Sequence, residues 1–227
     1  MVKKISSVKS TSITPQANGL TVKGLVTYED GSTDSLGIIV NKLSDTSYSK
    51  STTIGSKTSQ FTVTKVIKQQ SADSITVNLN IVGTINGKNY QLNKDFTVPL
   101  QYVNNARSIV QHFYNPSVPS YSVNYSDIYP TDPSCAGNYW CDLVMTAICT
   151  AGIETACAYD SALIILAVCA LVCVLDPVCI AGCEIVALAA GVDLILAAAC
   201  AELSDLGITQ AGCKAASGTV CANINCP

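Results

Sequence analysis

Hydrophobic and polar residues follow two different periods along this chain, and the change between them divides it. From Leu20 to about Tyr102 apolar and polar positions alternate in short runs, and the segment Phe61–Val66 alternates strictly. A period of two is typical of a β-strand with one buried and one solvated face. Beyond about residue 140 the period changes to about 3.6, and long apolar runs indicate buried helices. The pattern predicts an N-terminal β region and a C-terminal helical region.

The clearest β-hairpin joins Ile75–Ile85 to Lys88–Leu100 through Asn86-Gly87. This residue pair suits a type I′ turn, because both of its positions need a positive φ angle. Apolar residues occupy every second position from Ile75 to Ile81, so the first arm has one face to bury. Six or seven such strands within about 100 residues predict an antiparallel β-sandwich or a small barrel.

Residues 103–134 differ from the regions on either side of them. Four prolines, Pro116, Pro119, Pro130 and Pro133, punctuate a stretch rich in serine, tyrosine and asparagine. Because this proline density opposes helix, we predict an extended linker between a β domain at residues 1–102 and a helical domain at residues 135–227. The expected fold class is two-domain α+β, with an N-terminal antiparallel β-sandwich or barrel and a C-terminal disulfide-rich α-helical bundle.

Four helices are expected in the C-terminal domain, near residues 143–158, 162–175, 177–203 and 210–222. The segment Ala162–Leu175 has no polar side chain other than two cysteines. It is shorter than the roughly 20 residues that span a bilayer, and a helix that is apolar all round is buried in a core or in lipid. Asp176 and Pro177 then provide an N-cap and the first residue of the next helix.

All twelve cysteines lie in the C-terminal domain, where they make up about 13% of the residues. They are Cys135, Cys141, Cys149, Cys157, Cys169, Cys173, Cys179, Cys183, Cys200, Cys213, Cys221 and Cys226. Their even number and density predict disulfides and a secreted, extracellular protein. Two cysteine pairs are spaced four residues apart, so both members face one side of a helix and favour bridges to another helix. Met1–Ser7 is basic but lacks the apolar core of a signal peptide, which leaves the export route open.

Several classes of function find no support in the sequence. Zinc sites favour Cys-x2-Cys pairs or histidines, and residues 135–227 contain neither. A nucleophilic cysteine would also lack a histidine base there. The single arginine, Arg107, and the absence of a basic stripe argue against binding of nucleic acid. We therefore expect no catalytic residues, no metal and no other cofactor.

The two regions carry opposite charge. Residues 1–134 contain twelve basic and eight acidic residues, for a net charge of +4, whereas residues 135–227 contain Lys214 and eight acidic residues, for −7. Opposite signs favour docking of the two modules on each other, although each surface also needs charge for solubility.

The C-terminal domain resembles the small, cysteine-rich microhalocins among the halocin-type bacteriocins. The resemblance rests on a compact Ala-, Gly- and Cys-rich module, on Val178–Cys183 with its cysteines four residues apart, and on the closing segments Gly212-Cys213 and Val220–Cys226. It covers about 90 residues, some 40% of the chain. It implies an antimicrobial protein made as a longer precursor, whose N-terminal part can act as an immunity protein.

We therefore favour a secreted bacteriocin that acts on competing cells, with the target-cell envelope or membrane as its partner. In this hypothesis an apolar helical hairpin inserts in lipid after its release, and the N-terminal module makes an immunity contact, within the chain or in trans. The candidate membrane-active residues are Leu163, Leu166, Leu171, Leu175, Leu194 and Leu196. Burial alone also explains such helices, and an acidic module lacks the cationic face of typical membrane-active helices.

The alternative is a structural or adhesive protein of a cell surface or appendage, with a disulfide-hardened helical cap. Exposed edge strands in residues 20–100 would favour this alternative, because such subunits join by strand addition.

Overall fold

The computed structural model describes residues 3–114, 117–118, 120–124, 128, 139–152, 156–157, 161–203 and 210–225. Seven strands precede the first helix, and one short strand follows it. The strands are β1 (Ile5–Gln16), β2 (Gly19–Tyr28), β3 (Thr33–Lys42), β4 (Ser47–Ile54), β5 (Lys57–Gln70), β6 (Ser74–Ile85), β7 (Lys88–Pro99) and β8 (Tyr121–Asn124). The helices are α1 (Leu100–Phe113), α3 (Tyr139–Ala151), α5 (Ser161–Val172), α6 (Pro177–Ala189), α7 (Val192–Leu203) and α8 (Gln210–Asn225).

The strands form one eight-stranded antiparallel sheet in the order β7-β6-β5-β4-β3-β2-β1-β8. Strands β1 to β7 each lie beside their neighbours in sequence, because tight turns connect them. The turn between β6 and β7 contains Asn86 and Gly87 at φ 49° and 81°, as the type I′ prediction requires. Along β6, Val77, Leu79 and Ile81 are buried, which confirms the expected apolar face.

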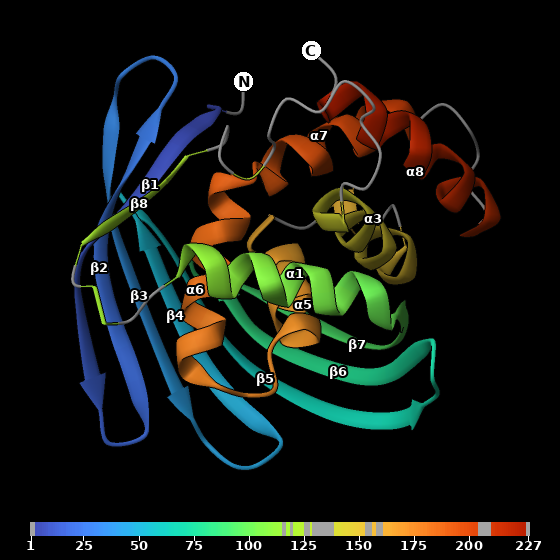
Figure 1. Cartoon of the computed structure of the whole chain (residues 1–227), viewed down its shortest axis with the longest axis horizontal. Helices are drawn as coiled ribbons and strands as arrows, with labels where there is room; N and C mark the ends of the chain where they lie inside the picture. The colour runs from blue at the N-terminus through green and yellow to red at the C-terminus, as the bar shows by residue number, and fades with distance from the viewer. Residues whose placement is uncertain are drawn as a thin grey trace.

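The helices cover the apolar face of this sheet. Helix α6 contacts β1, β2, β3 and β8, whereas α5 contacts β5 and β6, and α1 contacts β6 and β7. Helix α3 also contacts β7, whereas α7 packs on α3, α5 and α6. Helix α8 packs on α3 and α7. Figure 1 shows the sheet bending around the helices, with α5 and α6 against its inner face. The buried residues of the sheet and of the helices form a single hydrophobic cluster.

The α+β class is confirmed, with an antiparallel sheet first and a disulfide-rich helical region after it. The expectation of a sandwich or closed barrel is wrong, since β7 and β8 are the edges of one open sheet. Strands with one apolar face need only one covering layer, and here apolar helices provide it instead of a second sheet.

The predicted linker begins with a helix and not with an extended chain. Helix α1 starts at Leu100 and ends at Phe113, so the predicted boundary at residue 102 falls within its first turn. Its buried residues Val103, Ala106 and Val110 recur at helical spacing, and the prolines of the linker all follow Phe113. Farther on, Tyr121–Asn124 is extended, as predicted, and pairs with β1.

The C-terminal region is helical, but one predicted helix is divided in two. Asp176 caps α6 as expected, since its Oδ1 accepts a 3.0 Å hydrogen bond from the Val178 N–H, and Pro177 follows at the first helical position. The helix predicted to continue to Leu203 ends instead at Ala189. Gly191 takes a φ of 69° there, and α7 leaves at an angle of 56° to α6. The glycine makes this left-handed conformation accessible.

Candidate functional site

The α5–α6 hairpin lies at the centre of the molecule. Every residue of α5 from Leu163 to Val172 is buried, and so is every residue of α6 from Ile180 to Ala189. A helix that is apolar on all sides can be fully buried only when other elements pack around it. Here the sheet covers one side of the hairpin, and α1, α3 and α7 cover the others.

The structure places the six candidate membrane-active leucines in two groups. Leu163, Leu166 and Leu171 are buried in α5, and Leu175 is buried in the turn that follows. On α7, Leu196 is buried and Leu194 is half-buried. Within the described residues no single helix is long and apolar enough to cross a membrane, although Pro177–Ala189 and Val192–Ala201 together reach that length as a bent pair.

Ten cysteines form five disulfides in the described part of the chain, and none of these ten is free. The bridges are Cys141–Cys221, Cys149–Cys213, Cys157–Cys200, Cys169–Cys183 and Cys173–Cys179. The cysteine pairs spaced by four residues each bridge to the other helix of the hairpin, as predicted. Cys135 and Cys226 lie outside the described residues. Five disulfides are compatible with an extracellular protein.

None of these disulfides reaches the N-terminal part of the chain, because all ten cysteines fall between residues 141 and 221. Within the described residues, therefore, only the connecting chain and non-covalent contacts hold the sheet and α1 to the hairpin. Most of these contacts are apolar. A few buried polar contacts supplement them, and we call these the polar anchors: Lys50 and Thr52 on Glu184, Lys65 on the Cys173 carbonyl, and Arg107 on the Val172 carbonyl.

The first anchor is a buried ion pair between strand β4 and helix α6. The Lys50 Nζ lies 2.6 Å from the Glu184 Oε1, and their side chains are 2% and 4% exposed. The Thr52 hydroxyl donates a 2.7 Å hydrogen bond to the same oxygen. Burial lowers the pKa of Lys50, while the charge of Glu184 opposes that shift. Removal of either charge would leave the other buried without a counter-charge, which strongly destabilises a folded protein.

The other anchors lie at the C-terminal end of α5. The Lys65 Nζ donates a 3.1 Å hydrogen bond to the Cys173 carbonyl, and the Arg107 Nε donates a 2.9 Å bond to the Val172 carbonyl. The last carbonyls of a helix lack partners within the helix and carry partial negative charge, so cations bind well there. Burial, together with the charge of Arg107, lowers the pKa of Lys65 to about 8.

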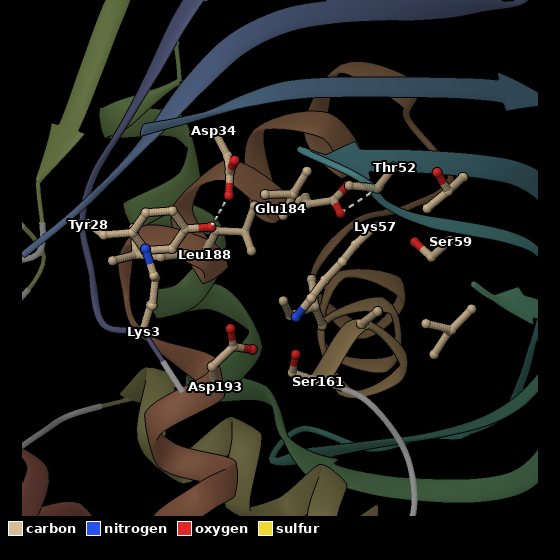
Figure 2. Close-up of a pocket in the computed structure, with 16 residues that line it drawn as sticks. Lys3, Tyr28, Asp34, Thr52, Lys57, Ser59, Ser161, Glu184, Leu188 and Asp193 are labelled. Carbon is tan, nitrogen blue, oxygen red and sulfur yellow. Dashed lines mark hydrogen bonds between the residues drawn. The ribbon is translucent and has the colours of Figure 1, made fainter. Parts of the chain in front are cut away.

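A cavity of about 420 Å³ lies beside the Lys50–Glu184 pair, between the sheet and the helices. Figure 2 shows its polar side chains, which come from Lys3 ahead of β1 and from β2, β3, β4, β5, α5, α6 and α7. Its walls are apolar where Ile54, Ile165 and Leu188 line it. Its carboxylates are Asp34, Glu184 and Asp193, and its ammonium groups are Lys3 and Lys57. A concave, largely apolar space with a few polar groups is the usual form of a small-molecule site.

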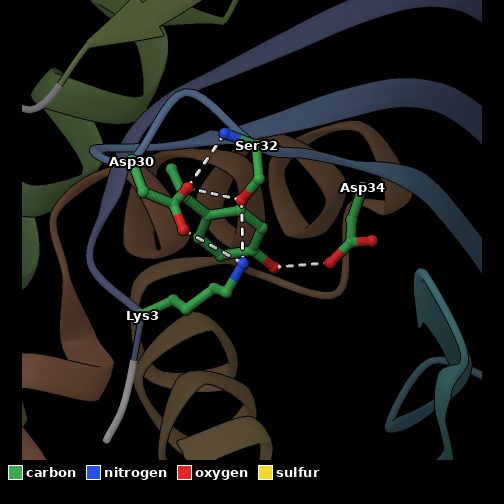
Figure 3. Close-up of polar contacts among 5 residues, drawn as sticks. Lys3, Asp30, Ser32 and Asp34 are labelled. Carbon is green, nitrogen blue, oxygen red and sulfur yellow. Dashed lines mark hydrogen bonds and ion pairs between the residues drawn. The ribbon is translucent and has the colours of Figure 1, made fainter.

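A polar network holds one edge of the cavity (Figure 3). The Lys3 Nζ lies 3.2 Å from the Asp30 Oδ2 and donates a 2.9 Å hydrogen bond to the Ser32 hydroxyl. Hydrogen bonds from Ser32 and Lys3 lower the pKa of Asp30 to about 2. The Tyr28 hydroxyl donates to Asp34 at 2.9 Å, and burial together with this carboxylate raises the pKa of Tyr28 to about 12.

Sequence reasoning missed the polar anchors and the cavity. Lys50 and Glu184 lie far apart in sequence, on opposite sides of the predicted linker. Two signals were present. Lys50 occupies an inward position of an alternating strand, between Tyr48 and Thr52, and Glu184 is the only charge in the apolar run from Val178 to Val192.

Comparison of the chain with protein-family models, with curated proteins and with solved structures finds no match. Among the described residues, no group of three or more His, Cys, Asp or Glu side chains is arranged to hold a metal ion.

Proposed function

We propose that the chain is a secreted antimicrobial protein of bacteriocin type, in which the N-terminal sheet masks a disulfide-stapled helical module. The observation that carries this proposal is the arrangement of bonds around the α5–α6 hairpin. The disulfides of the described residues all lie within the helical module, whereas the sheet contacts it without a covalent cross-link. The two parts can therefore separate after one cut in the connecting chain, with these bridges intact.

Separation would uncover the side of the hairpin that contacts the sheet and α1, while α3 and α7 would remain packed on it. In the full chain its apolar residues contact the sheet and the neighbouring helices. Without the sheet, one long side of α5 and α6 would face water, at a cost of about 25 cal/mol for each Å² of apolar surface exposed. A lipid surface would remove that cost. This supports action at the envelope of a target cell, with the membrane as the partner.

Charge complementarity supports the masking role of the N-terminal part. This part carries a net charge of +4 against −7 for the remainder. At the interface itself, Lys50, Lys65 and Arg107 all belong to the N-terminal part and bind acceptors on the hairpin. The resemblance of the C-terminal module to microhalocins points the same way, since it implies an N-terminal immunity partner.

The test uses the full chain with a specific protease site placed within residues 129–133, and a control with a scrambled site. We expect cutting to raise killing of related strains, membrane depolarisation to accompany killing across a dose series, and reductant to abolish both. An excess of a fragment that comprises residues 1–128, added in trans, should protect the cells. Failure of both intact and cut protein to inhibit any strain of a broad panel would refute the proposal. Killing without depolarisation would move the target away from the membrane.

The structural or adhesive alternative receives less support. Such a protein would need an open strand edge for assembly, and β7 is one edge of the sheet. This strand carries Lys88, Lys94 and Asp95, and charged side chains along an edge oppose the addition of another strand. Concentration-dependent polymers of the purified chain would favour this alternative.

A further inference from the structure

A residue in the wall of the 420 Å³ cavity has a buried polar atom without a partner among the described residues. Glu184 forms part of the cavity wall, its side chain is 4% exposed, and its Oε1 binds both Lys50 and Thr52. Its Oε2 is buried and has no hydrogen-bond partner among the described residues. A buried carboxylate oxygen without a donor is costly, and folded proteins rarely leave one in this state. This oxygen therefore indicates that a donor from outside the chain completes the site.

The charges around the cavity favour a positive donor. Among the described residues, three ammonium groups lie at the cavity or pair with its carboxylates, those of Lys3, Lys50 and Lys57. Four carboxylates accompany them, those of Asp30, Asp34, Glu184 and Asp193. Negative charge exceeds positive charge by one among these residues. Figure 2 shows Asp34 and Asp193 on two sides of the space, with Lys57 extending towards Ser161.

The walls favour an aliphatic body on the same ligand. Ile5, Ile54, Ile85, Ile165 and Leu188 contribute the apolar part of the lining. A cavity of this volume lies within the usual range for small organic ligands. An inorganic cation would leave these walls without contacts, and an anionic lipid would meet the carboxylates.

We propose that this cavity binds a small primary amine with an aliphatic tail. The ammonium group donates to the Glu184 Oε2 and to Asp34, and the tail packs against the isoleucines and Leu188. This inference rests on the full chain and its cavity, and it stands whether or not the chain is antimicrobial.

The experiment titrates the full chain with three probes of equal tail length, n-octylamine, 1-octanol and octanoate, by isothermal titration calorimetry. We expect octylamine to bind with a stoichiometry of one, and at least about tenfold more tightly than octanoate, because the carboxylates attract one head group and repel the other. Octanol, which can donate but carries no charge, should fall between them. Binding of octanoate as tightly as octylamine, or of none of the probes, would overturn the proposal.

Variants separate the cavity from the rest of the surface. Asp34→Asn removes one negative charge from the lining and should weaken octylamine about fivefold to tenfold. Asp45→Asn makes the same change at an exposed residue outside this cavity, beside Lys42, and should leave the affinity unchanged. Ile165→Trp fills the space and should abolish binding, with its fold checked by circular dichroism. Equal affinities in Asp34→Asn and Asp45→Asn would place the amine elsewhere and contradict the proposal.

Discussion

Among the polar anchors, the Lys50–Glu184 ion pair is the one for which a single substitution should reduce the stability of the protein most. We predict that Lys50→Met lowers the free energy of unfolding by about 3–5 kcal/mol, because it leaves a buried carboxylate without its counter-charge. The double variant Lys50→Met, Glu184→Met should recover most of this loss. Denaturant unfolding of each variant measures the effect.

Lys42→Met provides a matched control for this substitution. The Lys42–Asp45 pair has the same charges, but its side chains are 44% and 98% exposed. Exposed pairs contribute less than about 1 kcal/mol, so this variant should resemble the wild type. Similar losses for Lys50→Met and Lys42→Met would mean that burial does not strengthen the anchor.

Lys65 gives the stability of the protein a specific dependence on pH. Its pKa falls from the ordinary 10.5 to about 8 in the folded state. Between these values the unfolded chain binds a proton that the folded chain does not, so the free energy of unfolding rises with pH. Below about pH 8 both states are protonated and the contribution is constant. We expect a rise of up to about 3 kcal/mol between pH 8 and 10.5.

Comparison with Lys65→Met isolates this contribution. The variant should show a smaller rise than the wild type, and the difference is the contribution of Lys65. Lys50, whose pKa burial also lowers, contributes equally to both proteins. Denaturant unfolding at several values from about pH 8 to about pH 10 measures it, and the comparison ends there because Tyr28, with its raised pKa, lowers stability at higher pH. An identical rise in the variant would assign the effect to another group.

At the scale of elements, the disulfides differ in the size of the loop that each closes. Cys141–Cys221 spans 80 residues, but Cys149–Cys213 lies inside it and leaves a smaller effective loop. Cys173–Cys179 spans only 6 residues. In the chain-entropy model, removal of the longer bridge costs about 3 kcal/mol and removal of the shorter one about 2 kcal/mol.

Double Cys→Ala variants of each bridge test this order by denaturant unfolding. We expect the variant without Cys141–Cys221 to be the less stable of the two by about 1 kcal/mol. The reverse order would show that packing around the α5–α6 turn outweighs chain entropy in this module.

Elements with a strong local signal could be predicted from the sequence, and those that depend on distant contacts could not. The β6–β7 hairpin follows from Asn86-Gly87 and strict alternation, and the start of α6 follows from Asp176-Pro177. Helix α1 was missed because the prolines farther along dominated the composition of its segment. The break at Gly191 was missed because a glycine within an apolar helix also fits close helix packing.

At the scale of the whole molecule, the sequence predicted the parts but not how they combine. Period-two and period-3.6 patterns indicate which face of each element is apolar, and they do not specify what covers it. The sheet and the helices were predicted as two domains joined by a linker, and the sequence did not indicate that their buried residues form one cluster. The cavity and the Lys50–Glu184 pair arise from that shared core, so neither could be located before the sheet was placed on the hairpin.

The chain order of the sheet has a consequence for biosynthesis. Strands β1 to β7 pair only with sequence neighbours, and β7 ends at Pro99, before α5 and α6 begin. Because a ribosome makes the N-terminus first and local contacts form fast, the seven-stranded sheet can fold while the apolar hairpin is still unsynthesised. The hairpin then emerges beside a template already shaped to receive it. We therefore expect the sheet to cover the apolar residues of α5 and α6 during synthesis and to limit their aggregation before their cysteines are oxidised.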